Sequence, residues 1–268
     1  MTAAPARRWL ITGASSGIGA ALVEAAVAAG DTVVACARNA AALARLEAAA
    51  PEQVTALPLD VSKLDRIGPA IAEVLGAGPL DVVVNNAGQG LFGTCEETAL
   101  AEARGVFEVN LFAPWAVAQA VLPHFRARRT GLFVQMSSAA GLAAVPGMSA
   151  YSASKFALEG FSEALAAETA AFGIRVLLVE PGCVATPFIG AGTPVAARRI
   201  TAYDPISVQG KAAIEDYYRG VTLSAAEVAT TIMQAIDNPD HPLRLLVGDD
   251  HRPAAAAKGE QLVRLARR

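Results

Sequence analysis

The sequence predicts an α/β fold of the doubly wound kind, with a mostly parallel sheet of seven strands and helices on both of its faces. Seven apolar runs are nearly continuous in Val, Leu, Ile and Ala, which is typical of parallel strands buried on both sides. Helical patterns separate these runs, and such repeated alternation builds this kind of sheet. The 268 residues are 53% hydrophobic and contain no Pro/Gly/Ser linker, so we expect a single domain over residues 1–268.

Each expected element is placed by its apolar pattern and by the turn residues beside it. The seven strands are expected at 9–12, 32–37, 54–59, 81–85, 132–136, 175–179 and 243–247. Helices are expected at 17–29, 39–50, 64–75, 100–128, 150–172 and 225–237. Residues 183–223 break the alternation with prolines, glycines and scattered aromatic residues. Because a connection this long in a compact domain usually serves binding, we expect a substrate lid there.

Composition excludes several classes of function. The 22 basic and 25 acidic residues give a net charge of −3 without a basic stripe, so no nucleic acid partner is expected. The cysteines at 36, 95 and 183 and the three histidines lack metal-ligand spacing, which predicts free thiols in a reducing compartment and no metal site. No stretch has the pattern of a signal peptide or a membrane span. We therefore expect a soluble cytoplasmic protein without a membrane partner.

The first expected strand leads into the glycine-rich segment TGASSGIG at residues 12–19. Glycines in such a turn let the backbone approach a ligand, and the N-terminus of the following helix favours a pyrophosphate. A strand before and a helix after the turn are the context in which this pattern indicates a dinucleotide site. The alternative is a strand–helix turn with no ligand. The candidate contact residues of this turn are Gly13, Ser15, Ser16, Gly17, Ile18 and Gly19.

The end of the second expected strand bears on the choice of dinucleotide. Folds that prefer NAD place a carboxylate there for the ribose 2′-hydroxyl, whereas this chain has Ala37 followed by Arg38. A guanidinium pairs well with a 2′-phosphate, so NADP(H) is favoured over NAD(H). The alternative is an arginine that only faces solvent. After the third strand, Asp60 and Val61 are placed to meet the adenine with a carboxylate and a backbone N–H.

A tyrosine and a lysine four residues apart, Tyr151 and Lys155, share one face of the expected helix 150–172. A phenol titrates near ~10 in water, and a neighbouring cation favours the phenolate and lowers that pKa. The pair therefore suits general acid–base catalysis on an alcohol or a carbonyl. Ser138, thirteen residues before the tyrosine, is a candidate third member. The alternative is a chance pairing on an exposed helix face.

These segments occur in a familiar order: TGASSGIG, NNAG at 85–88, Asn110, Ser138, YSASK at 151–155 and PG at 181–182. With them the chain resembles the classical short-chain dehydrogenase/reductase family, which has a Rossmann-like fold, over roughly residues 8–190. The resemblance implies that Tyr151 is the catalytic acid/base and that Lys155 lowers its pKa and binds the nicotinamide ribose. Ser138 would hold the substrate oxygen. Asn110 would shape a helix kink and seat a water of a proton relay.

The resemblance also implies further cofactor contacts. They are expected from Asn86, Ala87 and Gly88 on the adenosine ribose side and from Pro181, Gly182, Val184 and Thr186 beside the nicotinamide. Ser137 is a rival for the serine role, but the spacing from Ser138 to the tyrosine matches the family. The glycine turn has no basic residue, so Arg38 would carry most of the recognition of a 2′-phosphate.

Apolar residues near these motifs predict a hydrophobic substrate. The leading hypothesis is an NADP(H)-dependent carbonyl reductase or alcohol dehydrogenase. The alternatives are an imine or enoyl reductase of a biosynthetic pathway and a non-catalytic NADP-binding sensor or scaffold. The long helices at 100–128 and 150–172 resemble the pair that forms the family's dimer interface, so a homodimer or homotetramer is expected. The candidate pocket residues are Leu91, Phe92, Leu142, Val145, Met148 and Phe188, with Gln89, Tyr203, Tyr217 and Tyr218 beside them.

Overall fold

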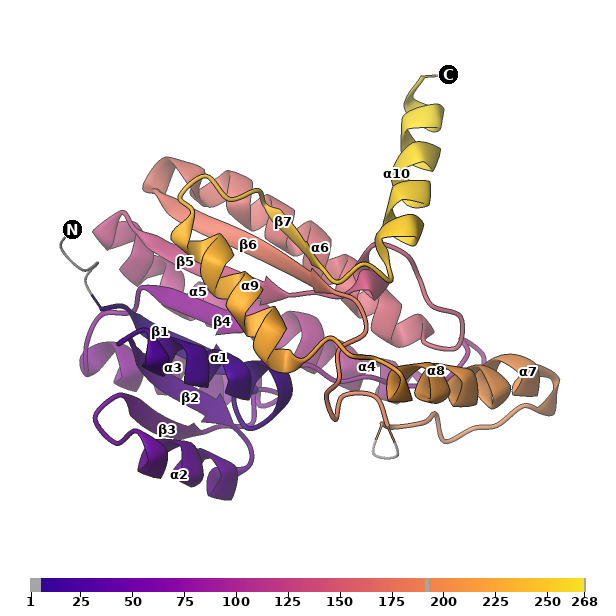
Figure 1. Cartoon of the computed structure of the whole chain (residues 1–268), viewed down its shortest axis with the longest axis horizontal. Coiled ribbons are helices and arrows are strands. Elements are labelled where there is room, and N and C mark those ends of the chain that lie inside the picture. The colour runs from indigo at the N-terminus through magenta and orange to yellow at the C-terminus, as the bar shows by residue number, and fades with distance from the viewer. Residues whose placement is uncertain (1–5, 191–192, 268) are drawn as a thin grey trace.

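One sheet of seven strands forms the centre of the molecule in the computed structural model, which describes residues 6–190 and 193–267. The strand order is β3-β2-β1-β4-β5-β6-β7, and all pairings between these strands are parallel (Figure 1). The expected fold is confirmed, and in the described residues the sheet is wholly parallel. The strands are β1 (Arg8–Thr12), β2 (Thr32–Ala37), β3 (Val54–Pro58), β4 (Val82–Asn85), β5 (Gly131–Met136), β6 (Ile174–Pro181) and β7 (Arg244–Val247).

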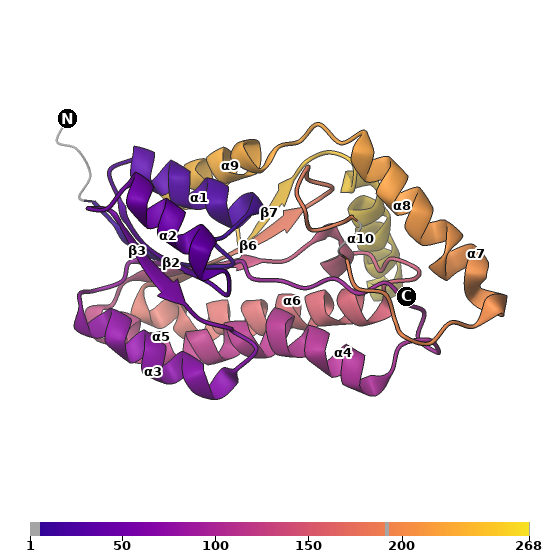
Figure 2. The ribbon, with the colours of Figure 1, turned by 90° about the horizontal axis from the view of Figure 1, so that it is seen from below.

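Helices cover both faces of this sheet, as expected of a doubly wound fold. Figure 2 shows α1, α2 and α9 above the sheet and α3, α4, α5 and α6 below it. The first group comprises α1 (Gly17–Ala28), α2 (Ala40–Ala49) and α9 (Ala225–Asp237). The second comprises α3 (Leu64–Gly76), α4 (Leu100–Phe107), α5 (Ala113–Arg128) and α6 (Ser149–Thr169).

Two apolar layers, one on each face of the sheet, form the core. Successive side chains of a strand point to opposite faces, so neighbours on β5 belong to different layers. Val134 packs with Leu22 of α1 and Ile232 of α9. Phe133 packs in the other layer, where its ring centroid lies 5.1 Å from that of Phe125 on α5. Burial on both faces explains why the strands are continuous apolar runs.

The expected long helix at 100–128 is interrupted by a π-helix at Glu108–Phe112, between α4 and α5. Asn110 lies in this turn, and its side-chain amide accepts from the backbone N–H of Gln89 (2.8 Å) and donates to Ser154 Oγ (2.9 Å). Both bonds tie the turn to neighbouring segments, which favours the wider helical turn. Such turns occur frequently at functional sites.

The same helical stretch also bears on the membrane expectation. Among the described residues, 100–128 is the one stretch long and apolar enough to cross a membrane, with a hydropathy of 1.3. The sequence patterns alone predict no such stretch. Yet 44% of the tested window is buried inside the protein, and the core helix of a soluble protein meets the same criteria. Length and composition alone therefore do not indicate a membrane span here.

Two segments outside the helix ranges given by the sequence are helical. The lid segment forms a 3₁₀ turn at Thr201–Tyr203 and the helices α7 (Asp204–Ser207) and α8 (Gln209–Arg219). The spacing of Ile214, Tyr217 and Tyr218, with the Lys211–Glu215 ion pair of 2.6 Å, was a helical pattern that the scattered glycines and prolines obscured. Residues 191–192 of the expected lid lie outside the described residues. The tail forms α10 (Arg252–Ala266), which points away from the body in Figure 1.

Candidate active site

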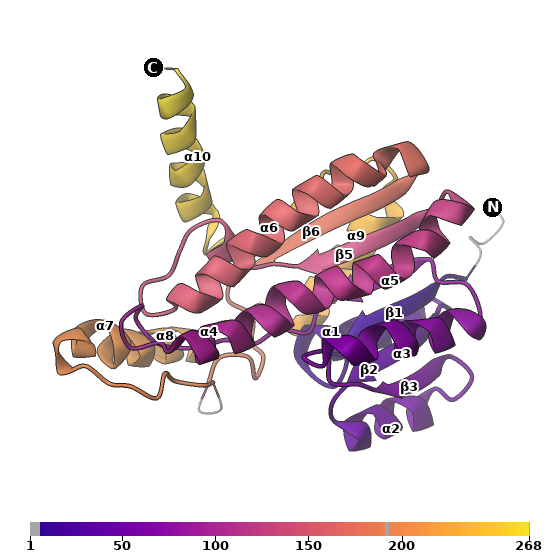
Figure 3. The same ribbon diagram turned by 180° about the vertical axis from the view of Figure 1, so that it is seen from behind.

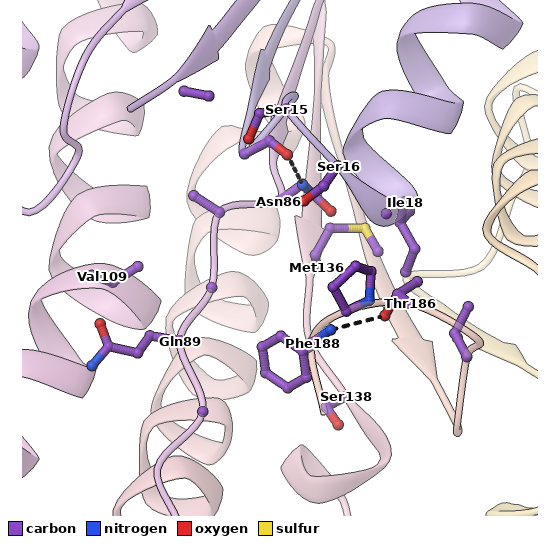
Figure 4. A pocket seen from close by; sticks show the side chains of 18 of the residues that line it. Ser15, Ser16, Ile18, Asn86, Gln89, Val109, Met136, Ser138, Thr186 and Phe188 are labelled. Atoms are coloured by element: carbon purple, nitrogen blue, oxygen red, sulfur yellow. Dashed lines mark hydrogen bonds between the residues drawn. The ribbon is translucent and has the colours of Figure 1, made fainter. Parts of the chain in front are cut away.

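A cavity of about 780 Å³ lies at the carboxyl ends of the central strands, where the strand order reverses between β1 and β4. Ligands of open α/β sheets bind at such a reversal. The cavity extends from Ser15, Ser16 and Ile18 of the glycine turn to Ser138 and Phe188 at its other end (Figure 4). One cavity thus joins the segment expected to bind the dinucleotide to the segment expected to carry out the chemistry.

The glycine turn lines one end of this cavity in a conformation that requires glycine. Gly13 and Gly17 have φ values of 68° and 55°, a region that other residues rarely adopt. A Cβ atom on Gly17 would lie 3.4 Å from the Thr186 side chain across the cavity. Gly19 was expected to contact the ligand, but it is not part of the described cavity lining. Its Cα instead packs the helix against the turn. A Cβ on Gly19 would lie 2.3 Å from the carbonyl oxygen of Gly13.

Asn86 fastens the glycine turn to the end of β4. Its Nδ2 donates to the carbonyl oxygens of Thr12 (2.9 Å) and Gly13 (3.2 Å), and its backbone N–H donates to Thr12 Oγ1 (3.0 Å). Ala87 and Gly88 follow along the cavity wall, as expected. Thr12, which the sequence analysis did not single out, is buried and holds both segments in register.

Arg38, Asp60 and Val61 line the far end of the cavity, together with Asn39 and Leu59, which had not been expected there. Arg38 is exposed. Burial would raise the pKa of Asp60, but hydrogen bonds from Ser62 and the charges of Arg38 and Lys63 hold that pKa below its ordinary value. Asp60 is therefore a carboxylate at neutral pH, and its charge lies within reach of the guanidinium.

Ser138, Tyr151 and Lys155 meet at the other end of the cavity. Tyr151 and Lys155 lie on one buried face of α6, and the Lys155 Nζ is 5.9 Å from the tyrosine ring centroid. That ammonium donates to the carbonyl oxygen of Met136 at 2.7 Å. Ser138 Oγ accepts from the Ala140 N–H (3.1 Å) and forms a hydrogen bond with the Tyr151 phenol. Ser137 also lines the cavity, but Ser138 is the serine that interacts with the tyrosine.

The pKa values of the tyrosine and the lysine are shifted in opposite directions by the same burial. Burial raises the pKa of Tyr151 to about 12, although the hydrogen bond with Ser138 lowers it in part. Burial lowers the pKa of Lys155 to about 8, against the charge of Glu159. The sequence predicts that the lysine lowers the tyrosine pKa. In this structure the ammonium donates to Met136 instead, so burial dominates at the phenol.

Asn110 does not appear among the described residues that line the cavity. It lies behind Gly88. A Cβ atom added to Gly88 would be 3.7 Å from Asn110 Oδ1 and 3.8 Å from Lys155 Nζ. Its amide also donates to the Gln89 carbonyl oxygen at 3.0 Å. Asn110 therefore fixes the loop beside the lysine, and it interrupts the helix with a π-turn at the position where a kink was expected.

The segment after β6 closes the cavity beside Tyr151. Pro181, the last residue of β6, lines the cavity together with Gly182, Val184 and Thr186, and their contacts with a nicotinamide stay predictions. A residue from the C-terminal part of the chain holds this segment, because Asp250 Oδ2 accepts from the backbone N–H of Cys183 at 2.9 Å. Asp250 lies far along the chain from this loop, and no local pattern in the sequence indicates the contact.

The expected pocket residues occupy three different places. Phe188 lines the cavity, with its ring centroid 5.6 Å from that of Tyr151. Phe92, Val145 and Met148 do not line it but pack behind Tyr151 in one apolar cluster. Leu91 packs elsewhere with Val106 of α4. Leu142, Tyr203 and Tyr217 are also absent from the described lining, whereas the lining includes Gln89, Gly90, Pro187, Thr193, Pro194 and Tyr218.

The sequence of this site has a match among known families. Residues 7–193 match the model of a family described as short chain dehydrogenase. The chain belongs to the short-chain dehydrogenase family.

Two curated relatives place this short-chain dehydrogenase among oxidoreductases. "Oxidoreductase BOA17" of Botryotinia fuckeliana is 34% identical over 95% of this chain and 93% of that protein. "Retinol dehydrogenase 8" of Bos taurus is 37% identical over 66% of this chain and 59% of that protein. The first match extends well beyond the residues that the family model covers.

Solved structures with this fold include proteins bound to nicotinamide dinucleotides. A short-chain dehydrogenase from Streptomyces avermitilis has a TM-score of 0.88 at 42% identity and covers 96% of this chain and 93% of its own. A family member from Burkholderia phymatum in complex with NAD has a TM-score of 0.82 at 27% identity, covering 97% and 94%. An alcohol dehydrogenase from Thermococcus sibiricus, complexed with 5-hydroxy-NADP, has a TM-score of 0.76 at 25% identity, covering 92% and 98%. The glycine turn of the present chain fits such a dinucleotide, because Gly13 and Gly17 line the cavity without side chains and let a ligand approach the backbone.

A buried carboxylate attaches the segment expected to be a lid to the body of this short-chain dehydrogenase. Glu97 is 2% exposed, and it accepts hydrogen bonds from the Ile200 N–H and Ser207 Oγ of the lid, both at 3.1 Å. It also accepts from Thr94 Oγ1 at 2.8 Å. Burial would raise the pKa of Glu97, but these hydrogen bonds hold it below its ordinary value. The carboxylate thus remains charged in the folded protein.

We predict that Glu97→Gln loosens the lid, because an amide cannot accept from both lid donors as strongly as a carboxylate does. Limited proteolysis should then cleave within the lid at least about tenfold faster than in the wild type, since cleavage follows the population of opened lid. The control is Glu96→Gln, which weakens only solvent-exposed contacts with the lid, a pair with Arg198 at 3.8 Å and the interaction with Tyr203, and should raise cleavage far less. Equal cleavage of both variants would contradict the assignment.

Proposed function

We propose that this short-chain dehydrogenase is an NADP(H)-dependent oxidoreductase of the carbonyl reductase or alcohol dehydrogenase type. It interconverts a ketone or aldehyde and the corresponding alcohol on a hydrophobic small molecule. The proposal is carried by the cavity that has the glycine turn and Arg38 at one end and Ser138, Tyr151 and Lys155 at the other. A nicotinamide cofactor supplies the hydride when it is bound, and the protein supplies orientation and the proton.

Tyr151, Ser138 and Lys155 have different roles in the transfer of a proton to the substrate oxygen. Tyr151 gives its phenolic proton to that oxygen in reduction and takes it back in oxidation. Because burial raises its pKa to about 12, the phenol holds its proton at neutral pH, as an acid for reduction must. Ser138 donates a hydrogen bond to the same oxygen and stabilises developing negative charge. Lys155, buried one turn along α6, stabilises the phenolate left after transfer.

The cavity wall near Tyr151 favours a hydrophobic substrate. Phe188, Pro187 and Pro194 present apolar surface, and Tyr218 from lid helix α8 adds an aromatic face. Small-molecule sites are mostly apolar with a few polar anchors, and here the anchors are Ser138 and Tyr151. The relative whose name is "Retinol dehydrogenase 8" agrees with a bulky alcohol or aldehyde.

We predict that Tyr151→Phe lowers turnover of a hydrophobic ketone by about 10²–10⁴-fold, the usual contribution of general acid catalysis. NADPH binding, followed by nicotinamide fluorescence, should change little, because the ring remains in place. The matched control is Tyr217→Phe, whose side chain is 56% exposed and does not line the cavity. Undiminished turnover in Tyr151→Phe would refute the acid/base role.

The preference for NADP(H) is supported by Arg38. It lines the cavity at the end of β2, where Ala37 stands in place of a carboxylate that would bind the ribose 2′-hydroxyl. Its guanidinium is exposed and can form a bidentate pair with a 2′-phosphate. Asp60 lies close enough to Arg38 for their charges to interact, which orients the guanidinium at this end.

We predict that Arg38→Gln weakens NADPH binding about 10- to 100-fold while NADH binding stays within about twofold, because one charge-assisted interaction contributes about 1.5–3 kcal/mol. Fluorescence titration with each nucleotide measures both constants. Arg45→Gln is the control, since Arg45 is exposed on α2 and does not line the cavity. An equal loss for both nucleotides would contradict a role in 2′-phosphate recognition.

We also propose that the protein is a cytoplasmic homodimer or homotetramer. The described cysteines are free thiols, which suits a reducing compartment. Figure 3 shows α4 and α5 end to end, with α6 alongside them, on one face. Large apolar side chains on this face are exposed, and a patch of this kind supports contact with a second copy. They are Leu100 (75%), Phe112 (42%), Trp115 (44%) and Phe156 (40%).

Light scattering should therefore give two or four times the mass of one chain at micromolar concentration. Trp115→Glu should lower this mass toward that of a monomer, because it places a charge in an apolar contact. Val208→Glu is the control, as this residue is 44% exposed but lies in the lid. A wild-type protein that is monomeric at these concentrations would overturn the proposal.

A further inference from the structure

Two buried glutamates lie directly behind the catalytic lysine and have no part in the chemistry described above. Glu159 follows Lys155 by one turn of α6, and Glu180 lies on β6 immediately before the Pro181–Gly182 segment. Their exposed fractions are 5% and 0%. Neither lines the cavity, so neither is expected to touch the substrate or the cofactor.

A single arginine serves both of these carboxyl groups and a third. Arg244 of β7 donates from Nη1 to Glu180 Oε1 at 2.8 Å and also to Glu159, while its Nη2 donates to Glu163. One positive charge thus faces three carboxyl groups. Glu163 is 57% exposed, so solvent screens its charge. The repulsion between carboxylates is therefore greatest between the two buried groups.

The outer oxygens of the two buried groups lack donors. Glu159 Oε1, Glu180 Oε2 and the hydroxyl of Ser137 have no hydrogen-bond partner among the described residues. A Cβ on Gly141 would lie 2.6 Å from Ser137 Oγ and 3.1 Å from Glu159 Oε1, so these two atoms adjoin one small space. The two carboxyl groups are neighbours, because Glu159 Oε2 and Glu180 Oε1 both accept from the same Nη1 atom of Arg244. An anionic oxygen buried without a donor is costly, and a proton held between the two carboxyl groups lowers this cost.

We propose that Glu159 and Glu180 share one proton and that this carboxyl pair is a positioning unit that sets the charge of Lys155. The proposal rests on the proposed function insofar as that charge matters for turnover. With the proton the pair carries one negative charge, and without it the pair carries two. The charged groups that face the pair are Lys155 and Glu163 of α6 and Arg244 of β7. The uncharged hydroxyl of Ser137, which follows β5, lies near Glu159.

The direction of the coupling follows from the charges. Burial and the charge of Glu159 raise the pKa of Glu180 to about 7, so the shared proton leaves near neutrality. The pair then gains negative charge in the range where Lys155, whose pKa burial lowers to about 8, would lose its own proton. The added negative charge favours the ammonium, and Lys155 therefore stays charged to higher pH than burial alone would allow.

The pair can be observed without any substrate. In protein labelled with ¹³C at the glutamate carboxyls, NMR should show one carboxyl that titrates near pH 7, far above the ordinary value of about 4.3. Glu180→Gln and Glu159→Gln should each abolish this titration, whereas Glu163→Gln, on the same helix and the same arginine, should retain it. If all glutamates titrate below about pH 5, no proton is shared and the proposal is overturned.

The effect on the lysine is measured in the same way. The chain has only four lysines, so the ¹³Cε signal of Lys155 is assignable from Lys155→Met. Its titration should move to lower pH by about half a unit or more in Glu159→Gln and Glu180→Gln, since each removes the charge gained near neutrality. It should not move in Glu163→Gln. An unmoved Lys155 titration in both buried variants would overturn the charge-setting role.

The pH profile of kcat/KM connects the pair to the proposed function. Its alkaline limb should shift to lower pH in the two buried variants and should superimpose on that of the wild type in Glu163→Gln. Unshifted profiles in an active enzyme would overturn the coupling to turnover. A wild type without turnover on hydrophobic carbonyls would count against the proposed function alone, because the two NMR titrations test the pair independently.

Discussion

Parallel pairing of the central strands is the constraint on which the site depends. In a parallel sheet all strands end at the same edge, so the segments that follow β1, β4, β5 and β6 converge there. The glycine turn, Asn86, Ser138 and Gly182 each follow a different strand. The hydrogen-bonded register of the sheet thus fixes the distances between these segments. A change in the register of one strand would move its segment away from the others.

Burial gives the closed end of the cavity its electrostatic character. The same low-dielectric surroundings raise the pKa of Tyr151 and lower that of Lys155, which keeps the acid protonated and makes the cation responsive near neutral pH. Lys155 is tied to the carbonyl oxygen of Met136, and Asn110 is held beside it by the π-turn. A charge in the core is tolerated here because each of its neighbours is itself fixed by hydrogen bonds.

Segments distant in the sequence complete the site from outside the sheet. Glu97 binds the lid to the loop after β4, and Asp250 holds the backbone beside Gly182. These carboxylates act through backbone N–H groups and hydroxyls, so they fix geometry without presenting a charge to the substrate. Arg244 also fixes geometry, because its ion pairs with Glu159 and Glu180 join β7 to α6 and β6.

The sequence by itself determined the fold class, the seven strands and the motifs that line the cavity, because these depend on local periodicity and on residues that follow strand ends. Gly13, Arg38, Ser138, Tyr151 and Lys155 all line one cavity for this reason, and their roles there stay predictions. Only the tertiary structure decided which apolar residues face the cavity, with Phe188 on the wall and Leu91 elsewhere. It also decided the pKa of Tyr151 and the contacts of Glu97, Glu180 and Asp250. Burial and long-range pairing set these properties, and both depend on how distant segments pack together rather than on any local pattern.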